Sequence, residues 1–334
     1  MTLLNDLPDL VSDWKESGFR LRLGEGFEPR GQLPFKASVS LLMAGEIRRD
    51  DVARFLAMAD EAGLKTCLTD VFNEAGVEVA VFVHDHFDSE FSHSLKFAEW
   101  NIDALHVGSL PDPRTPGVIL LDMDATCVQC ECIDEMAKLA GIGEQVSAVT
   151  AMAMRGHMEF QESFRRRIAL FEGKSESVMD TVEANLPVMP GFAEMVAKAK
   201  SCRWHVAIAS GGFTRFVGKL KREYDLDYVV ANNIEAVDGV FTGKVLGQIV
   251  DSKVKADTLL MLRDRYKLPA RNTMAVGDGA NDLPMIGLAG TGVAIHAKPV
   301  VREKAPIAIS RLNLHAVAAI LEAGLRLAKT GQPV

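Results

Sequence analysis

GVILLDMDAT, residues 117–126, is the stretch of sequence that decides the fold. Its apolar run from Val118 to Leu121 predicts a strand buried on both faces of a parallel sheet. Asp122 and Asp124 follow where that strand leaves the core, and ligand chemistry in open α/β sheets collects at the carboxyl ends of strands. One carboxylate there could attack phosphorus while the second moves protons. A plain surface Asp-x-Asp is the alternative, so the rest of the chain has to decide.

The composition is that of an ordinary globular protein. The 334 residues allow two domains, and 48% are hydrophobic and 25% charged. A net charge of −8 without a basic stripe argues against nucleic acid as a partner. We find no apolar signal core and no run near the roughly 20 residues of a membrane span, so we expect a cytoplasmic protein without a membrane partner. Cys127, Cys130 and Cys132 are expected to be buried thiols, with a zinc fragment as the alternative.

Residues 1–110 predict an α+β domain with the order βαββαβ. The order fits a ferredoxin-like sandwich and resembles the ACT family of amino-acid-sensing modules. Asp50 and Asp88 are expected to cap its two helices, and the residues before about 35 to form an extra arm. The segment 84–88, HDHFD, is either solvated or a metal site. The expected strands cover residues 37–44, 64–72, 77–83 and 102–107.

A linker and a second domain follow. Three prolines in PDPRTP, residues 111–116, predict a stiff linker. Residues 117–330 alternate buried strands with helices, which predicts a Rossmann-like parallel sheet. A helical insertion at about 133–190 is too long for a simple crossover and is expected to form a cap, and Asp238-Gly239 predicts a hairpin turn. Further strands are expected at 204–209, 228–231, 273–277, 292–295 and 306–309.

Three more polar groups accompany the expected strand ends. Ser210-Gly211-Gly212 offers a hydroxyl and exposed amides that suit a phosphate. Lys253 or Lys255 could neutralise a transferring phosphoryl group. The loop GDGAND, residues 277–282, carries two carboxylates suited to Mg²⁺. Each group alone could be a turn or a solvated surface, but the four together predict phosphoryl-transfer chemistry.

The four groups resemble the four motifs of the haloacid dehalogenase superfamily of phosphohydrolases, over about residues 115–325. Within it, ECIDE (131–135), AMRGHMEFQESFRRR (153–167) and SGGFT (210–214) are similar to the phosphoserine phosphatase family. The N-terminal domain is similar in kind to the regulatory domain of the longer bacterial members. One departure is Ala125, where the family usually has Ser; we expect activity to survive it.

The resemblance implies a role for each matching residue. Asp122 would be the nucleophile that forms an aspartyl-phosphate, and Asp124 the general acid and base. Mg²⁺ would be held by Asp122, the Asp124 carbonyl and Asp278, supported by Thr126 and Asp282. The phosphoryl group and the rest of the substrate would contact Ser210, Gly211, Gly212, Lys255 and Asn281.

The cap would supply specificity. The resemblance implies that Glu131 takes the substrate ammonium and that Arg167 pairs with the carboxylate, while Arg165 and Arg166 form a solvated face. Met154 and Phe160 would close an apolar lid, unless they belong to the core.

These roles predict an enzyme that hydrolyses O-phospho-L-serine to L-serine and phosphate, the last step of serine biosynthesis. The alternatives are a phosphatase or phosphotransferase of the same superfamily for another small phosphorylated metabolite, and an amino-acid sensor with a silent phosphatase domain. Three roles stay open for residues 1–110: pairing chains into a homodimer, binding serine as feedback, or stabilising the cap.

Overall fold

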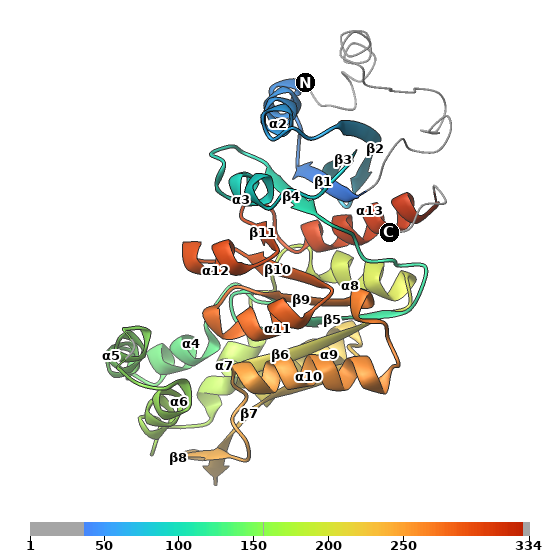
Figure 1. The fold of residues 1–334 in the computed structure, drawn as a ribbon. Coiled ribbons are helices and arrows are strands. Elements are labelled where there is room, and N and C mark those ends of the chain that lie inside the picture. The colour runs from blue at the N-terminus through green and yellow to red at the C-terminus, as the bar shows by residue number, and fades with distance from the viewer. Residues whose placement is uncertain (1–36, 156, 330–334) are drawn as a thin grey trace.

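The computed structural model describes residues 37–155 and 157–329; the predicted N-terminal arm lies outside them. The first of two sheets is antiparallel, with the order β2-β3-β1-β4 (Figure 1). That order is typical of the ferredoxin-like fold, which the sequence predicted, while the likeness to ACT modules stays a prediction. The elements of this part are β1 (Ser38–Ala44), α2 (Arg49–Glu61), β2 (Thr66–Glu74), β3 (Val77–His84), α3 (Ser89–Phe97) and β4 (Asp103–Val107).

Of the two predicted helix caps, the structure confirms one and contradicts the other. Asp88 caps α3, because its side chain accepts a hydrogen bond from the Phe91 N–H at 2.6 Å. The prediction for Asp50 is wrong: α2 begins at Arg49, two residues before the start that a cap at Asp50 implies, and Arg48 is its N-cap. There the Arg48 N–H donates to Asp51 Oδ2 at 3.0 Å, so Asp51 supplies the reciprocal half of a capping box.

The second sheet has seven strands in the order β11-β10-β9-β5-β6-β7-β8. All neighbours are parallel except β7 and β8, whose turn at Asp238 and Gly239 has φ of 51° and 78°, as a type I′ hairpin requires. Read in chain order, the parallel strands follow the Rossmann-like pattern 3-2-1-4-5-6, whose switch point lies between β5 and β9. The strands are β5 (Gly117–Leu121), β6 (Trp204–Phe213), β7 (Tyr228–Val237), β8 (Val240–Leu246), β9 (Thr273–Gly277), β10 (Thr291–Ile295) and β11 (Ile307–Ile309).

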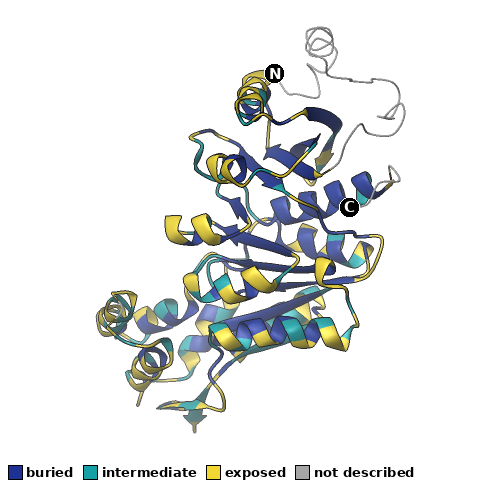
Figure 2. Ribbon diagram, in the orientation of Figure 1, coloured by how far each residue is buried: buried dark blue, intermediate teal, exposed yellow. Residues whose placement is uncertain are grey.

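Helices cover both faces of this sheet, and most of them present exposed outer sides (Figure 2). Ile119 and Leu121 of β5 belong to the cluster that includes α8, α9 and α13, while Val118 and Leu120 pack with α10, α11 and α12. The helical insertion, α4–α7, lies between β5 and β6 in the chain. The helices are α4 (Cys132–Leu139), α5 (Gly143–Met154), α6 (Phe160–Ala169), α7 (Ser177–Ala184), α8 (Phe192–Ser201), α9 (Thr214–Tyr224), α10 (Ser252–Arg265), α11 (Leu283–Leu288), α12 (Pro299–Lys304) and α13 (His315–Lys329), with short 3-10 turns η1 (Ala270–Asn272) and η2 (Ala280–Asp282).

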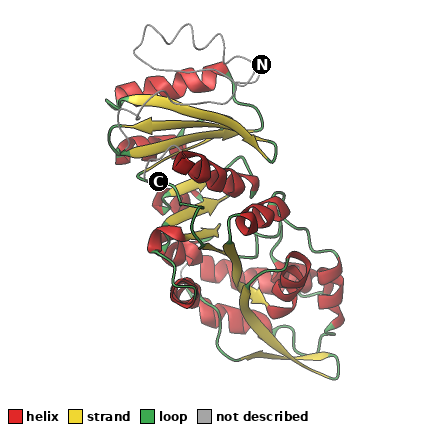
Figure 3. Ribbon diagram, turned by 90° about the vertical axis from the view of Figure 1, so that its right-hand side faces the viewer, coloured by secondary structure: helices red, strands yellow, loops and turns green. Residues whose placement is uncertain are grey.

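Helix α13 joins the two sheets. It is apolar almost all round, as expected of a helix without a solvent face, and it lies between the four-stranded sheet and the rest of the molecule (Figures 2 and 3). Leu41 of β1, Ile320 of α13 and Leu121 of β5 belong to one continuous hydrophobic cluster. At its rim, Arg326 pairs with Asp70 of β2 at 3.2 Å. The N-terminal sheet therefore shares a core with the Rossmann-like part.

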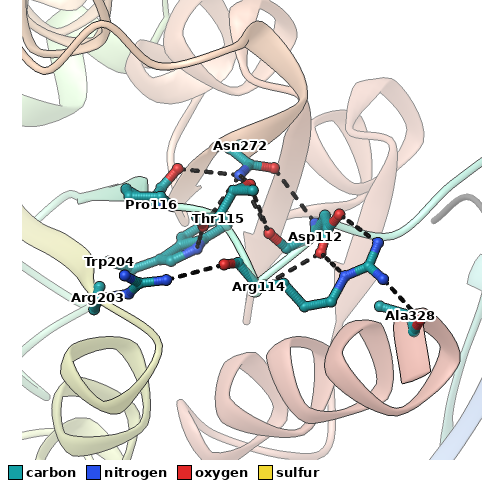
Figure 4. Close-up of polar contacts among 8 residues, drawn as sticks. All are labelled: Asp112, Arg114, Thr115, Pro116, Arg203, Trp204, Asn272 and Ala328. Atoms are coloured by element: carbon teal, nitrogen blue, oxygen red, sulfur yellow. Dashed lines mark hydrogen bonds and ion pairs between the residues drawn. The ribbon is translucent and has the colours of Figure 1, made fainter.

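The proline-rich segment between the sheets is fixed to the protein (Figure 4). The Asn272 amide donates to the carbonyls of Asp112 (3.2 Å), Thr115 (3.2 Å) and Pro116 (3.0 Å). Arg114 pairs with Asp112 and donates to the carbonyl of Ala328 in α13 at 2.9 Å. The prolines deny the segment ladder hydrogen bonds, and these side-chain contacts anchor its carbonyls instead.

Among the residues that the structure describes, none of the helices is both long and apolar enough to cross a bilayer.

Candidate active site

Asp122 lies at the carboxyl end of β5, beside the switch point of the sheet. Its N–H continues the sheet by donating to the Val276 carbonyl of β9 at 2.9 Å. Its side chain is buried, with Oδ1 accepting from the Met123 N–H at 2.6 Å and Oδ2 lying 2.7 Å from Lys255 Nζ. Burial raises the pKa of Asp122 well above its usual range, and the nearby Asp282 charge adds to this while Lys255 opposes it.

The loop after Asp122 turns sharply. The N–H groups of Thr126, Cys127 and Val128 all donate to the Met123 carbonyl at 2.8–3.2 Å. Ala125 has φ of +52°, a left-handed conformation that is uncommon for residues other than glycine. Asp124 accepts from the Cys132 N–H at 3.1 Å, and burial raises the pKa of Asp124. A carboxyl group that keeps its proton more readily suits a general acid.

Lys255 lies in the first turn of α10 and is 1% exposed. Its Nζ lies 2.7 Å from Asp122 Oδ2 and 2.8 Å from Asp282 Oδ1. Burial opposes the charge, but the two carboxylates outweigh it and raise the pKa of Lys255, so the ammonium stays charged. Lys253, the other candidate, is exposed and pairs with Asp257 at 2.5 Å, so the structure brings only Lys255 to the carboxylates.

Asp278 and Asp282 follow β9, the neighbour of β5. Asp282 is fully buried, and its two oxygens accept from Lys255 and from the Gly279 N–H (3.0 Å). A Cβ at Gly277 would lie 2.4 Å from Asp282 Cγ, so glycine is needed for this close approach. From the other described residues, the Asp278 carboxylate accepts a single long contact, from Thr126 Oγ1 at 3.5 Å. Burial and the Asp282 charge raise the pKa of Asp278 to about 6.

These carboxylates fit a divalent metal ion. Oxygens of Asp122, Asp278 and Asp282 lie within 4.8 Å of one another, and hard divalent cations prefer such oxygen ligands. Asp282 already uses both oxygens inside the protein, whereas Asp278 has nearly all of its acceptor capacity left. Burial is the main cause of the raised pKa of Asp278, and the Asp282 charge adds to it; a bound cation would relieve this repulsion.

Ser210, Gly211 and Gly212 form a bulge in β6 that approaches the carboxylates. The register with β7 jumps from Ala209–Val230 to Phe213–Asn232 across these residues. Ser210 is buried, and its Oγ accepts from the Gly212 N–H at 2.9 Å. A Cβ at Gly212 would lie 2.7 Å from Asp124 Oδ2, so the second motif contacts the first only because residue 212 is glycine.

Two charged residues of the insertion complete the electrostatics of the site. Glu131 is exposed at the start of α4, yet the protein around it desolvates its carboxylate, and with the charges of Asp124 and Asp278 this raises the pKa of Glu131 to about 7. Arg167 of α6 has a buried Nε without a hydrogen-bond partner among the described residues. Arg165 and Arg166 are exposed, as the sequence predicted, and Arg166 pairs with Glu162 at 2.6 Å.

The two predicted lid residues lie differently. Phe160 is half-buried at the start of α6, and its Cζ would lie 3.3 Å from a Cβ at Gly211, so it reaches the bulge of β6. Met154, at the end of α5, is 70% exposed, and the structure does not bring it to the carboxylates. Asn281 of η2 packs against Gly279 within its own loop. The substrate contacts of these three residues stay predictions.

Comparison with known proteins assigns the chain to a family. The sequence model of the haloacid dehalogenase-like hydrolases matches residues 119–287, which contain all four groups. The chain belongs to this family. The family resemblance predicted from the sequence is thereby confirmed.

Individual relatives of this hydrolase extend the match beyond that range. A phosphoserine phosphatase of Vibrio cholerae is 45% identical over 258 residues, which cover 77% of this chain and 78% of the relative. The crystal structure of a probable phosphoserine phosphatase from Vibrio cholerae in unliganded form has a TM-score of 0.77 at 38% identity, covering 98% of this chain and 96% of that one. A phospho-aspartyl intermediate analogue of phosphoserine phosphatase has a TM-score of 0.58 at 35% identity, covering 61% of this chain and 98% of that one.

Sequence reasoning missed two residues of this hydrolase that position the site. Asn232 of β7 is buried and donates to the Gly211 carbonyl at 2.8 Å, while its Oδ1 accepts from the Val250 N–H at 2.8 Å. Gln161 of α6 donates to Asp251 Oδ2 at 2.7 Å and so ties the insertion to the N-cap of α10. An amide in an otherwise apolar strand, as in YVVANN, was the available signal for Asn232; Gln161 gave none.

Proposed function

We propose that this hydrolase is a Mg²⁺-dependent phosphoserine phosphatase, which converts O-phospho-L-serine and water to L-serine and phosphate, the last step of L-serine biosynthesis. The proposal rests on two residues of opposite charge, Glu131 and Arg167, which interact electrostatically with each other and with Asp124. Asp124 in turn follows Asp122, which is paired with Lys255. The substrate carries an ammonium, a carboxylate and a phosphate, and each of them would meet its opposite charge. The names of the relatives support the same substrate.

Asp122 and Asp124 would share the chemistry. The Asp122 carboxylate attacks phosphorus, the bond from phosphorus to the serine oxygen breaks, and Asp124 donates its proton to that oxygen. Asp124 then takes a proton from water, whose oxygen attacks the aspartyl-phosphate, releasing phosphate and the Asp122 carboxylate. The raised pKa of Asp124 supports its first role, and the phospho-aspartyl analogue of a relative supports the covalent step.

Positive charge and N–H groups would hold the phosphoryl oxygens. Lys255, Ser210 Oγ and the Gly212 amide are the donors, and Asp282 orients Lys255 by accepting from it at 2.8 Å. Asp122, Asp278 and the Asp124 carbonyl would hold Mg²⁺, which supplies charge that screens the repulsion between carboxylate and phosphate. Thr126 would orient Asp278 through its contact at 3.5 Å.

The insertion would recognise the amino-acid part of the substrate. Glu131 would accept from the ammonium, and the Arg167 guanidinium, whose Nε lacks a partner among the described residues, would donate to the carboxylate. Phe160 and Met154 would cover the site during transfer. Phe160 already reaches the β6 bulge, and Met154 would have to move from its exposed position.

We further propose that residues 1–110 form a regulatory or dimerisation domain. Residues 111–116 would link it to the core of residues 117–330, whose cap covers 133–190. The enzyme would be a cytoplasmic homodimer. Sedimentation equilibrium measures the dimer directly; a monomer at all concentrations would refute it.

The test of the substrate is phosphate release with Mg²⁺ and with EDTA from phosphoserine, phosphothreonine, phosphohomoserine, phosphoglycolate and glucose 6-phosphate. Arg167→Gln should raise KM for phosphoserine at least about tenfold and leave hydrolysis of p-nitrophenyl phosphate unchanged. Arg166→Gln is the matched control, one residue away and exposed. Preference for glucose 6-phosphate, or equal effects of the two substitutions, would refute the assignment.

A further inference from the structure

A cavity lies between the N-terminal sheet and the Rossmann-like part, away from the carboxylate site. It has a volume of about 360 Å³ and is lined by α3 and β4 on one side and by α12, β11 and the loops after β10 and β11 on the other. In Figure 1, α3 and β4 lie beside β11 and α12. None of its lining residues belongs to the carboxylate site. The loops after β10 and β11 leave the sheet at the strands' carboxyl ends, the edge at which α/β sheets bind ligands.

The ionisable side chains that line this cavity are mostly basic. Lys96, His296, Arg302 and Arg311 stand against a single lining acid, Asp103. That carboxylate is already used, since it accepts from the backbone N–H groups of Ser310 and Leu312, each at 2.7 Å, and of Arg311. The cavity therefore keeps a surplus of positive charge.

The two arginines that line the cavity have side-chain N–H donors without a hydrogen-bond partner among the described residues. The side chains of Arg302 and Arg311 make no hydrogen bond or ion pair with any described residue, and Arg302 Nε is buried without a partner. The Arg302 guanidinium lies 4.5 Å from the centre of the Phe97 ring of α3, which holds it at the junction. A buried donor without a partner is costly, so a ligand that accepts from it is favoured.

We propose that this cavity binds a small metabolite with two or more negative charges on carboxylate or phosphate groups, bridging the N-terminal sheet and the Rossmann-like part. Guanidinium groups pair bidentately with both kinds of anion, and the volume is in the range of small-molecule sites. An amino acid such as serine is disfavoured, because Asp103 is occupied and no other lining carboxylate could take its ammonium.

Calorimetric titration of the metal-free full chain with citrate, inorganic phosphate and serine, at constant ionic strength, tests the proposal. Citrate and phosphate separate the carboxylate and phosphate classes. We expect saturable binding of at least one of them, weakened about tenfold or more by Arg302→Gln and by Arg311→Gln. Arg263→Gln, in α10 and outside the cavity lining, is the control and should bind as the wild type does.

Equal binding by the wild type and both cavity variants would refute the site, since the anion would then be bound elsewhere, for example at the carboxylate centre. Serine binding that depends on Arg302 would refute the charge class. If Arg302→Gln unfolds, Arg311→Gln decides, because the Arg311 side chain is exposed and makes no hydrogen bond or ion pair with a described residue. Phosphoserine hydrolysis by Arg311→Gln should equal that of the wild type, so the two proposals fail separately.

Discussion

Replacing Lys255 by methionine tests the electrostatic core of the site. The substitution keeps an unbranched apolar stem but removes the ammonium that lies 2.7 Å from Asp122 and 2.8 Å from Asp282. The carboxylates of Asp122, Asp278 and Asp282, whose oxygens lie within 4.8 Å of one another, then repel without that cation. Breaking a buried ion pair costs about 3–5 kcal/mol.

The cost should depend on pH in a defined direction. Lys255 lowers the pKa of Asp122, which burial already raises well above the unfolded value, so its removal raises that pKa further. The folded variant then binds more protons than the unfolded chain. Its free energy of unfolding is preserved below about pH 4, the pKa of an unfolded Asp, and falls as pH rises through the raised value. We expect about 3–5 kcal/mol of destabilisation at pH 7 and clearly less at pH 5.

Urea unfolding at both pH values, followed by circular dichroism, measures this difference. Lys253→Met is the matched control, since Lys253 is exposed in the same turn of α10 and its replacement should leave the free energy of unfolding nearly unchanged. Phosphoserine hydrolysis by Lys255→Met should fall at least about 100-fold. A loss of stability at pH 7 no larger than that of the control, or one equal at pH 5, would show that the carboxylates do not depend on Lys255.

Three further predictions concern the metal, the ammonium site and the closure of the insertion. Protons compete with the metal at Asp278, whose pKa is about 6. The affinity for Mg²⁺ should therefore rise about tenfold from pH 5 to pH 7 and then level off. Calorimetry that finds the same affinity at both pH values would contradict this. KM for phosphoserine should fall as pH rises through 7, where Glu131 loses its proton. Glu131→Gln should abolish that pH dependence and raise KM about tenfold at pH 8. If the pH profile of KM for Glu131→Gln matched that of the wild type, Glu131 would not be the residue that binds the ammonium. Gln161→Ala, which removes the contact with Asp251, should raise KM roughly two- to fivefold and speed amide exchange in α6; unchanged exchange would mean that this contact does not hold the insertion closed.

Local patterns predicted the strands and the polar groups at their ends well. Buried apolar runs such as residues 118–121 fix a parallel strand, and the carboxyl ends of such strands necessarily meet at one edge. The turn at Asp238-Gly239 was predictable for an equally local reason. Asp followed by Gly is favoured where both central residues of a turn need positive φ angles, as they have here. The polar groups that follow these strands in the sequence therefore lie together at one edge of the sheet.

Contacts between distant segments were not predictable in this way. The apolar periodicity of α13 predicts burial but does not say that β1–β3 cover one of its faces. The prolines of residues 111–116 predict stiffness but not the Asn272 side chain that anchors their carbonyls. Asn232 and Gln161 also act across long separations in sequence, and a single polar residue carries no signal of its distant partner.

The burial of α13 against the N-terminal sheet has a consequence for how the chain is made. Strands β1–β4 are synthesised first, but one of their faces is completed only by α13, roughly 200 residues after β4. At about 5–20 residues per second, that face waits for roughly 10–40 s on the ribosome. Proteolysis of stalled nascent chains that end before and after residue 329 should therefore show protection of residues 38–107 only in the longer chains. The emerging sheet would need a chaperone more than the later domain does, because its hydrophobic surface is exposed for most of translation.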